Sequence, residues 1–394
     1  MGIQSIKDLD LKSKRVLIRV DFNVPLDENL GIRDDARIRA ALPTIQYAVD
    51  AGAKVVLMSH LGRPKGKVDK KKSLLPVARR LSELLGTKVD MAPDCIGDKV
   101  KAMVDKLNSG DVLLLENLRF HIEEEKNDPG FAQELASLGD CFVNDAFATA
   151  HRAHASNVGV CNHISEKAAG FLLLREVDHI NKALKNPQRP FVAVVGGAKV
   201  SGKLEILENL IDKVDKLIIG GGMAFTFVKS LGEGIGKSLV EDDLLDKART
   251  IMEKARQTGI KLYLPVDCIC ASEAKEGVHT VVRTIQEITP DLIGLDIGPA
   301  SATLFSEALS DCKTIVWNGP MGMFEIDEFA QGTLSITNDI AASNALTIVG
   351  GGDTDAALHK SKVEDRIDFV STAGGAFLEM LGGRELPGVV ALEQ

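Results

Sequence analysis

Short apolar runs alternate along the chain with longer segments in which apolar residues recur every three or four positions. The runs are rich in β-branched residues and predict strands, whereas the longer segments predict amphipathic helices. We expect strands at 15–20, 55–59, 112–115, 142–145, 191–195, 217–219, 262–264, 292–296, 314–317 and 346–349. We expect helices at 35–51, 74–85, 204–214 and 244–257. Strands that are apolar throughout and alternate with helices predict an α/β protein with parallel sheets covered by helices on both faces.

The alternation of strands and helices pauses once, near the middle of the chain. A continuous helical pattern at 171–184 ends before Pro187 and Pro190, which suits a connector between domains. A chain of 394 residues is also longer than one ordinary core supports. We therefore expect two Rossmann-like domains, at 1–170 and 171–384, with a hinge helix at 171–186 joining them. The tail at 385–394 is expected to pack back on the first domain.

Composition narrows the range of functions. The formal net charge is −9 and aromatic residues make up only 4% of the chain, which argues against nucleic acid or a membrane surface as a partner. No apolar run is long enough to span a bilayer, and the first residues lack a signal-peptide pattern. Six cysteines without a C-x-x-C pair exclude a zinc knuckle and fit a reducing compartment. We expect a cytoplasmic protein.

Basic residues follow the expected strands of the first half repeatedly, although the chain as a whole is acidic. These residues are Arg37, His60, Arg63, Arg119, His121, His151, Arg152 and His154. Ligands of open parallel sheets bind beyond the carboxyl ends of the strands. A single arginine there is usually a solvated surface group, but the recurrence predicts a site for a small, highly charged anion. We interpret His121 with the acidic run Glu123–Glu125 as a solvated loop, and the lysines at 65–72 as a mobile basic loop.

Glycine turns follow the expected strands of the second half. They are Gly196–Gly197, Gly220–Gly222, Gly350–Gly352 and Gly374–Gly375. A glycine between a strand and a helix lets backbone N–H groups approach phosphate oxygens at the helix N-terminus. One such turn is explained equally well by close packing. Four of them in one domain favour nucleotide binding.

One glycine turn resembles a P-loop without being one. The segment 197–203 fits G-x-x-x-x-G-K, but Leu204 stands where a serine or threonine would hold magnesium. We interpret it as a turn that delivers Lys199 and Lys203, which share one face if a helix begins there. Asp353 after the third glycine turn has two interpretations, a helix N-cap or a carboxylate that meets magnesium on nucleotide phosphates. Both can hold together.

Longer sequence blocks resemble the phosphoglycerate kinase family. They include RVDFNVP at 19–25, SHLGRP at 59–64, LENLRF at 115–120, NDAF at 144–147, HRAHAS at 151–156, GGAKV at 196–200, GGGMA at 220–224, WNGPMG at 317–322 and GGGDT at 350–354. The blocks occur in order over essentially the whole chain. The resemblance implies transfer of a phosphoryl group from 1,3-bisphosphoglycerate to ADP, which yields 3-phosphoglycerate and ATP, by a monomer that uses Mg²⁺ with its nucleotide.

The same resemblance implies roles for individual residues. Phosphoglycerate would be held by Asp21, Asn23, Arg37, His60, Arg63, Arg119 and Arg152. The nucleotide would be held or bordered by Lys203, Gly220, Gly221, Gly294, Asn318, Glu325, Gly351, Gly352, Asp353 and Thr354, with Asp353 also meeting the magnesium. The catalytic set would be Arg37, Lys199, Gly374 and Gly375. No general base is expected, because the accepting carboxylate is already ionised at neutral pH.

Three positions depart from the family pattern. Ala148 and Ala373 stand where glycines are usual, and Phe377 replaces a small polar residue. Ala373 matters most, because its turn would face the transferred phosphoryl group. Two other functional classes also fit parts of the sequence: a P-loop-like NTPase, against which Leu204 counts, and a non-catalytic protein that binds phosphorylated metabolites.

Overall fold

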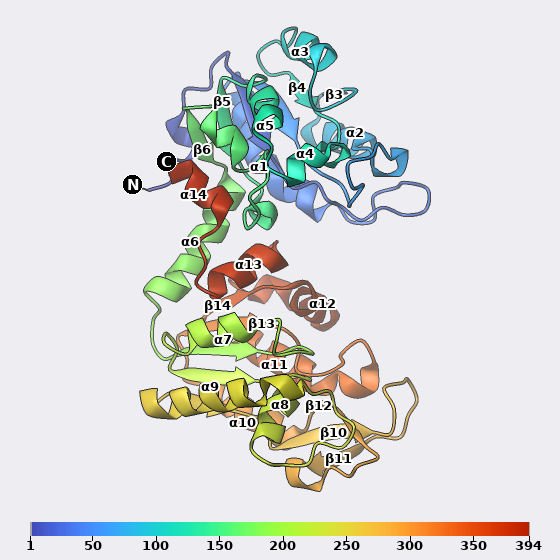
Figure 1. Cartoon of the computed structure of the whole chain (residues 1–394), viewed down its shortest axis with the longest axis vertical. Coiled ribbons are helices and arrows are strands. Elements are labelled where there is room, and N and C mark those ends of the chain that lie inside the picture. The colour runs from blue at the N-terminus through green and yellow to red at the C-terminus, as the bar shows by residue number, and fades with distance from the viewer. Residues whose placement is uncertain (1, 394) are drawn as a thin grey trace. The chain divides into compact units, whose positions relative to one another are not determined.

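The structure is a computed structural model that describes residues 2–393, and the chain divides into two compact units (Figure 1). Unit 1 comprises Met1–Asp178 with Glu385–Gln394, and unit 2 comprises His179–Arg384. The helix α6 (Phe171–Lys185) carries the chain from one unit to the other. The division falls within this helix rather than at its first residue.

Unit 1 is built on one parallel sheet of six strands. The strands are β1 (Arg15–Arg19), β2 (Lys54–Met58), β3 (Val89–Met91), β4 (Val112–Leu114), β5 (Cys141–Asn144) and β6 (Lys167–Ala169), in the order β3-β4-β2-β1-β5-β6. Successive residues of β4 and β5 are all buried, so side chains on both faces of the sheet are covered. The apolar pattern predicts four of the six strands; β3 (VDM) and β6 (KAA) were not predicted, because each is short and contains a charged residue.

The helices of unit 1 supply the apolar cover of this sheet. They are α1 (Ala36–Asp50), α2 (Leu75–Leu85), α3 (Asp98–Val104), α4 (Ile122–Glu125), α5 (Pro129–Ala136) and α14 (Pro387–Glu393). Ile38 and Ile45 of α1 pack with Leu81 of α2 in one core with strand residues. The last helix, α14, belongs to this unit because Gly388 N–H donates to the carbonyl of Ala150 at 2.8 Å.

The start of α6 is fixed by side chains of unit 1. Asp145, directly after β5, accepts hydrogen bonds at Oδ1 from the N–H groups of Leu172 at 2.9 Å and Leu173 at 3.2 Å. The Phe171 N–H donates to Oγ1 of Thr44 on α1 at 2.9 Å. These bonds satisfy N–H groups that a helix cannot satisfy itself. Burial raises the pKa of the Asp145 carboxyl to about 7, although these hydrogen bonds oppose the rise.

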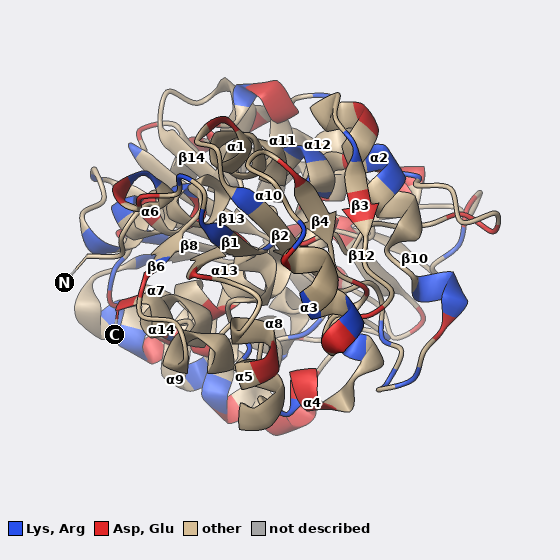
Figure 2. Ribbon diagram, turned by 90° about the horizontal axis from the view of Figure 1, so that it is seen from above, with Lys and Arg blue, Asp and Glu red and all other residues tan. Residues whose placement is uncertain are grey.

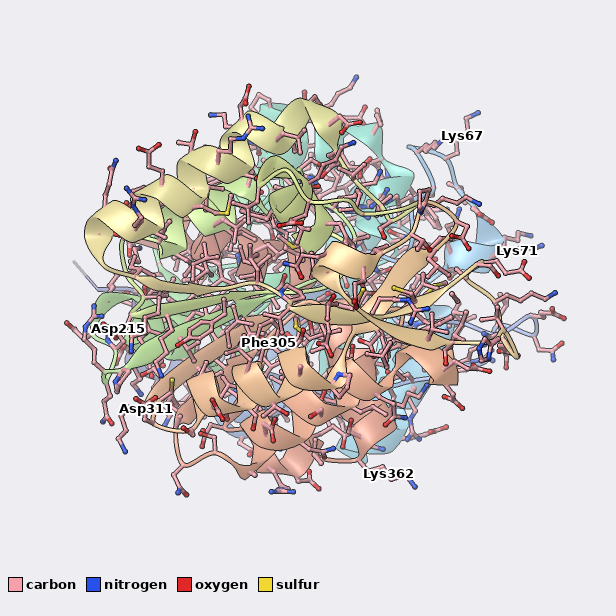
Figure 3. All side chains as sticks on the ribbon, turned by 90° about the horizontal axis from the view of Figure 1, so that it is seen from below. Lys67, Lys71, Asp215, Phe305, Asp311 and Lys362 are labelled. Carbon is pink, nitrogen blue, oxygen red and sulfur yellow. The ribbon has the colours of Figure 1, made fainter. Side chains whose placement is uncertain are left out.

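Unit 2 repeats the architecture with a second parallel sheet. Its strands are β7 (Phe191–Val195), β8 (Lys216–Ile219), β9 (Lys261–Tyr263), β13 (Thr314–Asn318), β14 (Leu346–Val349) and β15 (Phe369–Val370), in the order β15-β14-β13-β7-β8-β9. The helices are α7 (Leu204–Leu210), α8 (Ala224–Ser230), α9 (Leu245–Thr258), α10 (Pro299–Leu309), α11 (Gln331–Ala342), α12 (Gly352–Ser361) and α13 (Gly374–Leu381). Phe305 of α10, which Figure 3 labels, packs in one core with Val192 and Val194 of β7. The expected α/β fold class with two helix-flanked parallel sheets is confirmed.

A small antiparallel sheet is added to unit 2. It consists of β10 (Asp267–Ala271), β11 (Val281–Thr284) and β12 (Ile293–Ile297) in the order β11-β10-β12. The segment 292–296 was expected within the parallel series, and this expectation is wrong because β12 pairs antiparallel with β10. β10 lies between β11 and β12 and pairs antiparallel with both, so β12 belongs to this small sheet rather than to the parallel one.

No helix within residues 2–393 combines the length and the apolar character that crossing a bilayer requires.

Candidate functional site

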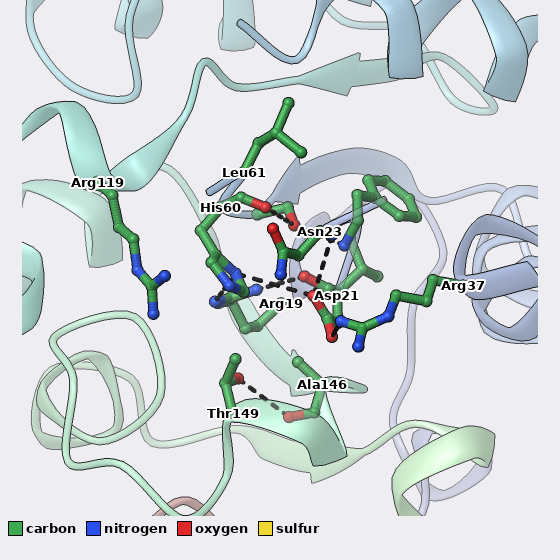
Figure 4. A network of polar contacts seen from close by, with 12 residues as sticks. Arg19, Asp21, Asn23, Arg37, His60, Leu61, Arg119, Ala146 and Thr149 are labelled. Atoms are coloured by element: carbon green, nitrogen blue, oxygen red, sulfur yellow. Dashed lines mark hydrogen bonds and ion pairs between the residues drawn. The ribbon is translucent and has the colours of Figure 1, made fainter. Parts of the chain in front are cut away.

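The basic residues of unit 1 gather at the carboxyl ends of its central strands. Asp21 follows β1, His60 follows β2, and Arg119 lies in a 3₁₀ turn after β4 (η3, Leu118–Phe120). Arg152 lies beyond the end of β5. Parallel strands bring these ends to one edge of the sheet, which is where open α/β folds bind ligands. Figure 4 shows the resulting network.

Asp21 supplies a carboxylate that accepts two hydrogen bonds of this network. Its carboxylate accepts a hydrogen bond from Nη1 of Arg37 in the first turn of α1, and a second from the N–H of Asn23 at 3.1 Å. The side-chain oxygen of Asn23 in turn accepts the N–H of Gly62 at 2.8 Å. These bonds join the loops after β1 and β2 to α1. Arg37 is more than one-third exposed, so its remaining donors face solvent.

His60 is held as a neutral imidazole. Its Nδ1 lies 3.1 Å from Nη2 of Arg19 and 3.8 Å from the Asp21 carboxylate. Burial, with the nearby charges of Arg19, Arg119 and Arg37, holds the pKa of His60 well below its usual value. Because Arg19 donates to Nδ1, the ring carries its proton on Nε2. This N–H is available as a donor to an anion.

Arg119 carries a buried donor that the protein does not satisfy. The side chain is only 4% exposed, and Nη1 donates to the carbonyl of Gly62 at 2.9 Å. Nη2 is buried and has no hydrogen-bond partner among the described residues. Burial, opposed by the carboxylate of Glu125, lowers the pKa of Arg119 without making it neutral at physiological pH. A buried cationic donor aimed into a basic cluster fits an anionic ligand.

Two further charged residues support the cluster, and sequence analysis did not identify either of them. Arg19 is fully buried and donates through Nε to the hydroxyl of Ser156 at 2.9 Å. That hydroxyl donates to Glu124 at 2.6 Å, and Glu124 also accepts the Ser156 N–H at 2.9 Å. The signal for Arg19 was present, because it is the only charge within an otherwise apolar strand run apart from Arg15 at its start.

The acidic run at 123–125 is therefore not a solvated loop. It lies in α4, which is red in Figure 2, and Glu124 has no exposed surface. Burial raises the pKa of Glu124, and the charge of Arg19 counteracts the rise. The interpretation as a solvated loop was wrong because three consecutive glutamates point in different directions on a helix. One of them can therefore face inward.

The other predicted phosphoglycerate residues occupy less enclosed positions. Arg152 is half-buried, donates through Nε to His151 at 3.1 Å, and lowers the pKa of Arg119 by its charge, which places it near the cluster. Arg63 is exposed and makes no hydrogen bond or ion pair with the described residues. The lysines of the adjacent basic loop project outward, as Lys67 and Lys71 do in Figure 3.

A separate cavity of 970 Å³ lies elsewhere in unit 1. Its lining includes Arg79 and Arg80 of α2, but none of the residues predicted to hold phosphoglycerate. Arg80 is already paired with Asp35 at 2.7 Å and Glu83 at 2.6 Å. This neutralisation makes the cavity a weaker anion site than the cluster around Arg119, despite its volume.

In unit 2, the first two glycine turns pack against each other. The N–H of Gly197 donates to the carbonyl of Pro320 at 2.8 Å, and that of Gly221 to the carbonyl of Met321 at 3.0 Å. Gly221 has φ +67°, and a Cβ there would lie 2.6 Å from the backbone nitrogen of Gly197. These N–H groups are therefore used within the protein. The expectation that they face phosphate is wrong, and close packing explains these glycines.

The last two glycine turns are different, because each opens a helix. Gly351, with φ +107°, is the N-cap of α12, and Ala373 is the N-cap of α13. A Cβ on Gly374 would lie 3.8 Å from the Cα of Gly351 and 3.9 Å from the nitrogen of Gly352, so the two helix N-termini meet. The first-turn N–H groups of both helices lack intrahelical partners. Two such termini at one point offer unpaired N–H donors in an arrangement that suits a phosphate group.

Asp353 lies in the first turn of α12 and does not cap it. The N-cap is Gly351, which has no side chain, so the interpretation of Asp353 as N-cap is wrong. The Asp353 carboxylate is exposed and makes no hydrogen bond or ion pair within residues 2–393. It is therefore available to a metal ion carried by a nucleotide, while Thr354 turns inward and accepts the Gly319 N–H at 2.7 Å.

Lys203 lies at the carboxyl end of β13 in the sheet of unit 2. Its ammonium donates to the backbone carbonyl of Asn318 at 3.0 Å and to the side-chain oxygen of the same residue. Burial lowers the pKa of Lys203 to about 8, and the charge of Asp353 opposes the shift. Lys199 is exposed and lies outside the helix, because α7 begins only at Leu204. The two lysines therefore do not share a helical face.

Three further predicted residues differ in how they are placed. Asn318 ends β13 and donates to the carbonyl of Gly350 at 2.6 Å, which links β13 to the turn before α12. Gly294 is in β12, where its missing side chain makes room for the ring of Phe225. Glu325 is exposed in the loop after β13.

The departures from the family pattern are accommodated locally. Ala373 has φ −131° and ψ 112°, an extended conformation that alanine adopts without strain. Phe377 is fully buried and packs under Gly350, where a Cβ would lie 2.5 Å from its ring. Ala148 is half-buried within a short 3₁₀ turn (η4, Phe147–Thr149). None of the three blocks the helix N-termini of unit 2.

Comparison with known proteins shows the family of the chain. The family model described as phosphoglycerate kinase matches residues 6–384. The phosphoglycerate kinase of Geobacter metallireducens is 57% identical over 395 aligned positions, which cover 100% of this chain and 99% of that protein. The phosphoglycerate kinase of Aquifex aeolicus is 56% identical over 390 positions, covering 99% and 98%.

Solved structures show the same relationship. The structure of phosphoglycerate kinase from Coxiella burnetii aligns with a TM-score of 0.93 at 47% identity, covering 100% of this chain and 99% of that one. The crystal structure of phosphoglycerate kinase from Pyrococcus horikoshii aligns with a TM-score of 0.84 at 34% identity, covering 99% and 98%. The sequence and the fold agree, and the chain belongs to the phosphoglycerate kinase family.

Proposed function

We propose that the chain catalyses reversible transfer of a phosphoryl group from 1,3-bisphosphoglycerate to Mg-ADP, giving 3-phosphoglycerate and ATP. The observation that carries the proposal is the pairing of two anion sites of different construction. Unit 1 offers arginine side chains, including the buried unsatisfied Nη2 of Arg119. Unit 2 offers two converging helix N-termini with Lys203 nearby. Membership of the family supports this reading of both sites.

Unit 1 would hold the phosphoglycerate. Arg119 and Arg152 suit its phosphate, because a guanidinium matches two phosphate oxygens at once. The Nε2–H of His60 and the amide of Asn23 would complete the set of neutral donors. Asp21 would act mainly by positioning Arg37, to which it is already bonded. Arg63 is also predicted to bind phosphoglycerate, but it is exposed, so its side chain would have to move inward to contact the substrate.

Unit 2 would hold the nucleotide. The N-termini of α12 and α13 would receive phosphate oxygens, and Lys203 would add positive charge. Mg²⁺ would arrive with the nucleotide and neutralise its phosphates, and the exposed Asp353 carboxylate would meet it. Gly220, Gly221, Gly294 and Glu325 would border the base and ribose without donating backbone hydrogen bonds to phosphate.

The chemistry requires positioning and charge neutralisation rather than a base. The attacking group in the direction of bisphosphoglycerate formation is a carboxylate, which is ionised at neutral pH. Arg37 and Lys199 keep exposed cationic donors and would neutralise the phosphoryl group in transfer, together with the N–H groups of Gly374 and Gly375. Closure of the two units around both substrates would exclude the water that hydrolyses an acyl phosphate.

A coupled assay of ATP formation tests the proposal. With 1,3-bisphosphoglycerate and Mg-ADP both present, we expect ATP to appear in proportion to the enzyme, and to stop when either substrate is omitted. ATP hydrolysis in water without phosphoglycerate would favour a P-loop-like NTPase. Binding of phosphoglycerate by calorimetry with no ATP formation would favour a non-catalytic binding protein.

A further inference from the structure

A second cluster of chemically reactive side chains lies in unit 1, at the edge of the parallel sheet. Asp94 and Cys95 follow the edge strand β3, and His121 follows η3 after the neighbouring strand β4. One potential ligand atom from each residue, a carboxylate oxygen, Sγ and a ring nitrogen, lies within 4.8 Å of the other two. None of the three belongs to the proposed phosphoglycerate or nucleotide sites.

The three side chains are oriented by contacts that do not depend on a ligand. Asp94 Oδ1 lies 2.7 Å from Nε2 of His121 and accepts the N–H of Cys95 at 2.7 Å. The ring of His121 packs against Phe131 with centroids 5.4 Å apart. A backbone hydrogen bond from Glu116 to the carbonyl of Asp94, at 3.3 Å, ties the two loops together. The cluster is thus assembled from two segments and held in place.

We propose that Asp94, Cys95 and His121 form a binding site for a borderline-soft divalent cation of the zinc type. Thiolate, imidazole and carboxylate are the three ligand classes that Zn²⁺ uses in proteins. Tetrahedral ligand atoms around zinc lie about 3.5 Å apart. The hydrogen bond of 2.7 Å between Asp94 Oδ1 and His121 Nε2 must therefore open and release its proton when a cation binds. Small rotations of the partly exposed Asp94 and His121 side chains allow this opening, while Cys95 stays fixed in the interior.

The residue types also define which cations are excluded. A hard cation such as Mg²⁺ prefers oxygen ligands and is not expected to displace protons from a thiol and an imidazole. The site is therefore chemically distinct from the magnesium that accompanies the nucleotide. Burial, with the adjacent Asp94 carboxylate, holds the pKa of Cys95 well above its usual value, so the thiol keeps its proton unless a cation replaces it.

Exposure provides both an entry route and a free coordination position. The side chain of Asp94 is 46% exposed and that of His121 is 27% exposed. A cation can approach from this side, and water can supply a fourth ligand. Cys95 is fully buried and forms the floor of the site. Three protein ligands with one open position predict reversible binding rather than a permanent structural metal.

Cobalt substitution on the full-length, chelator-treated protein tests the proposal. We expect one Co²⁺ per chain with a thiolate-to-cobalt charge-transfer band, which Cys95→Ser abolishes and excess Mg²⁺ does not. Cys161→Ser is the matched control, because Cys161 is also buried in unit 1 but is not among the clustered ligand groups of the described chain. Absence of the band in the unmodified protein overturns the proposal.

Two further variants keep the test decisive if Cys95→Ser fails to fold. His121→Gln and Asp94→Asn alter partly exposed side chains, and each should weaken Zn²⁺ binding more than ~10-fold in competition with a chromophoric chelator. Unchanged affinity in both variants overturns the proposal. The buried thiols of Cys268 and Cys270, whose sulfurs are 3.2 Å apart, are the competing site. A band that survives Cys95→Ser but is lost in Cys270→Ser also overturns it.

Discussion

At the scale of single residues, the expected affinity of unit 1 for an anion depends on which of its polar groups lack a hydrogen-bond partner. Asp21, Asn23 and His60 are already bonded to neighbours, so they act as a fixed frame. Arg119 is the member with a buried donor that has no partner within residues 2–393. Leaving a buried cationic donor unpaired is costly, and an anionic substrate removes that cost when it binds. Arg119 should therefore contribute most to affinity for phosphoglycerate.

Arg119→Ala should weaken phosphoglycerate binding by roughly 10- to 100-fold, because hydrogen bonds to charged groups are worth about 1.5–3 kcal/mol. The affinity for Mg-ADP should stay unchanged. Calorimetric titration with 3-phosphoglycerate measures the effect. Arg79→Ala is the control, since Arg79 is an exposed arginine of the same unit outside the cluster. Equal losses in the two variants would show that general positive charge, rather than Arg119, provides the affinity.

Arg37→Ala should lower kcat far more than it weakens nucleotide binding. Arg37 is anchored by Asp21 through one nitrogen and keeps exposed donors for the group in transfer. Steady-state rates, with Kd for ADP measured separately, give the comparison. A shift in nucleotide Kd with an unchanged kcat would mean that Arg37 belongs to the nucleotide site instead.

Asp353→Asn should selectively weaken the magnesium–nucleotide complex. The carboxylate is exposed and is not needed to cap α12, so the helix should persist in the variant. We expect a higher Mg²⁺ requirement and a KM for Mg-ADP raised by about 10-fold, the equivalent of 1.4 kcal/mol. Phosphoglycerate affinity should not change. Identical magnesium dependence in both proteins would remove Asp353 from the metal's surroundings.

At the scale of elements, the apolar pattern predicted most strands, and the errors have specific causes. The strands β3 and β6 were missed because each is short and its apolar run is broken by a charged residue, Asp90 or Lys167. The placement of β12 in the parallel series was wrong because its pairing with β10 is a tertiary contact, which the strand's own residues do not encode. Glu124 was missed because burial on a short helix depends on what packs against it. Local pattern therefore predicted most strands of the two parallel sheets, but not the tertiary partners of the elements.

The cap of α6 predicts a pH-dependent stability. The Asp145 pKa is raised to about 7 in the folded chain by burial. The folded state therefore keeps a proton that the unfolded state loses near pH 4. The contribution of Asp145 to the free energy of unfolding is highest at low pH and falls as the pH rises toward 7. Above pH 7 this contribution is constant.

Asp145→Asn should remove this slope while keeping an acceptor for the N–H groups of α6. From pH 5 to pH 8, the unfolding free energy of the unmodified protein should fall relative to the variant by at most about 3 kcal/mol. Urea unfolding at several pH values measures the difference, in which contributions from all other groups cancel. Parallel pH profiles for the two proteins would contradict a raised pKa at Asp145.

At the scale of the whole molecule, we propose that two similar units carry anion sites of different construction. Unit 1 would use side-chain cations after its strands, whereas unit 2 would use the N-termini of α12 and α13. Both sites remain predictions, which the sequence allows because arginines and glycines after apolar runs are visible locally. Sequence analysis did not predict that two of the four glycine turns serve packing, since that depends on contacts such as Gly221 with Gly197. Nor did it predict the support that Arg19 and Glu124 provide.

The central claim is that each unit holds one substrate of a single phosphoryl transfer. Initial rates of ATP formation, with each substrate varied in turn, test it most directly on the Arg119→Ala and Asp353→Asn variants. The account predicts that Arg119→Ala raises only the KM for 1,3-bisphosphoglycerate, and that Asp353→Asn raises only the KM for Mg-ADP. If either variant raises the KM of the other unit's substrate instead, the assignment of substrates to units is contradicted.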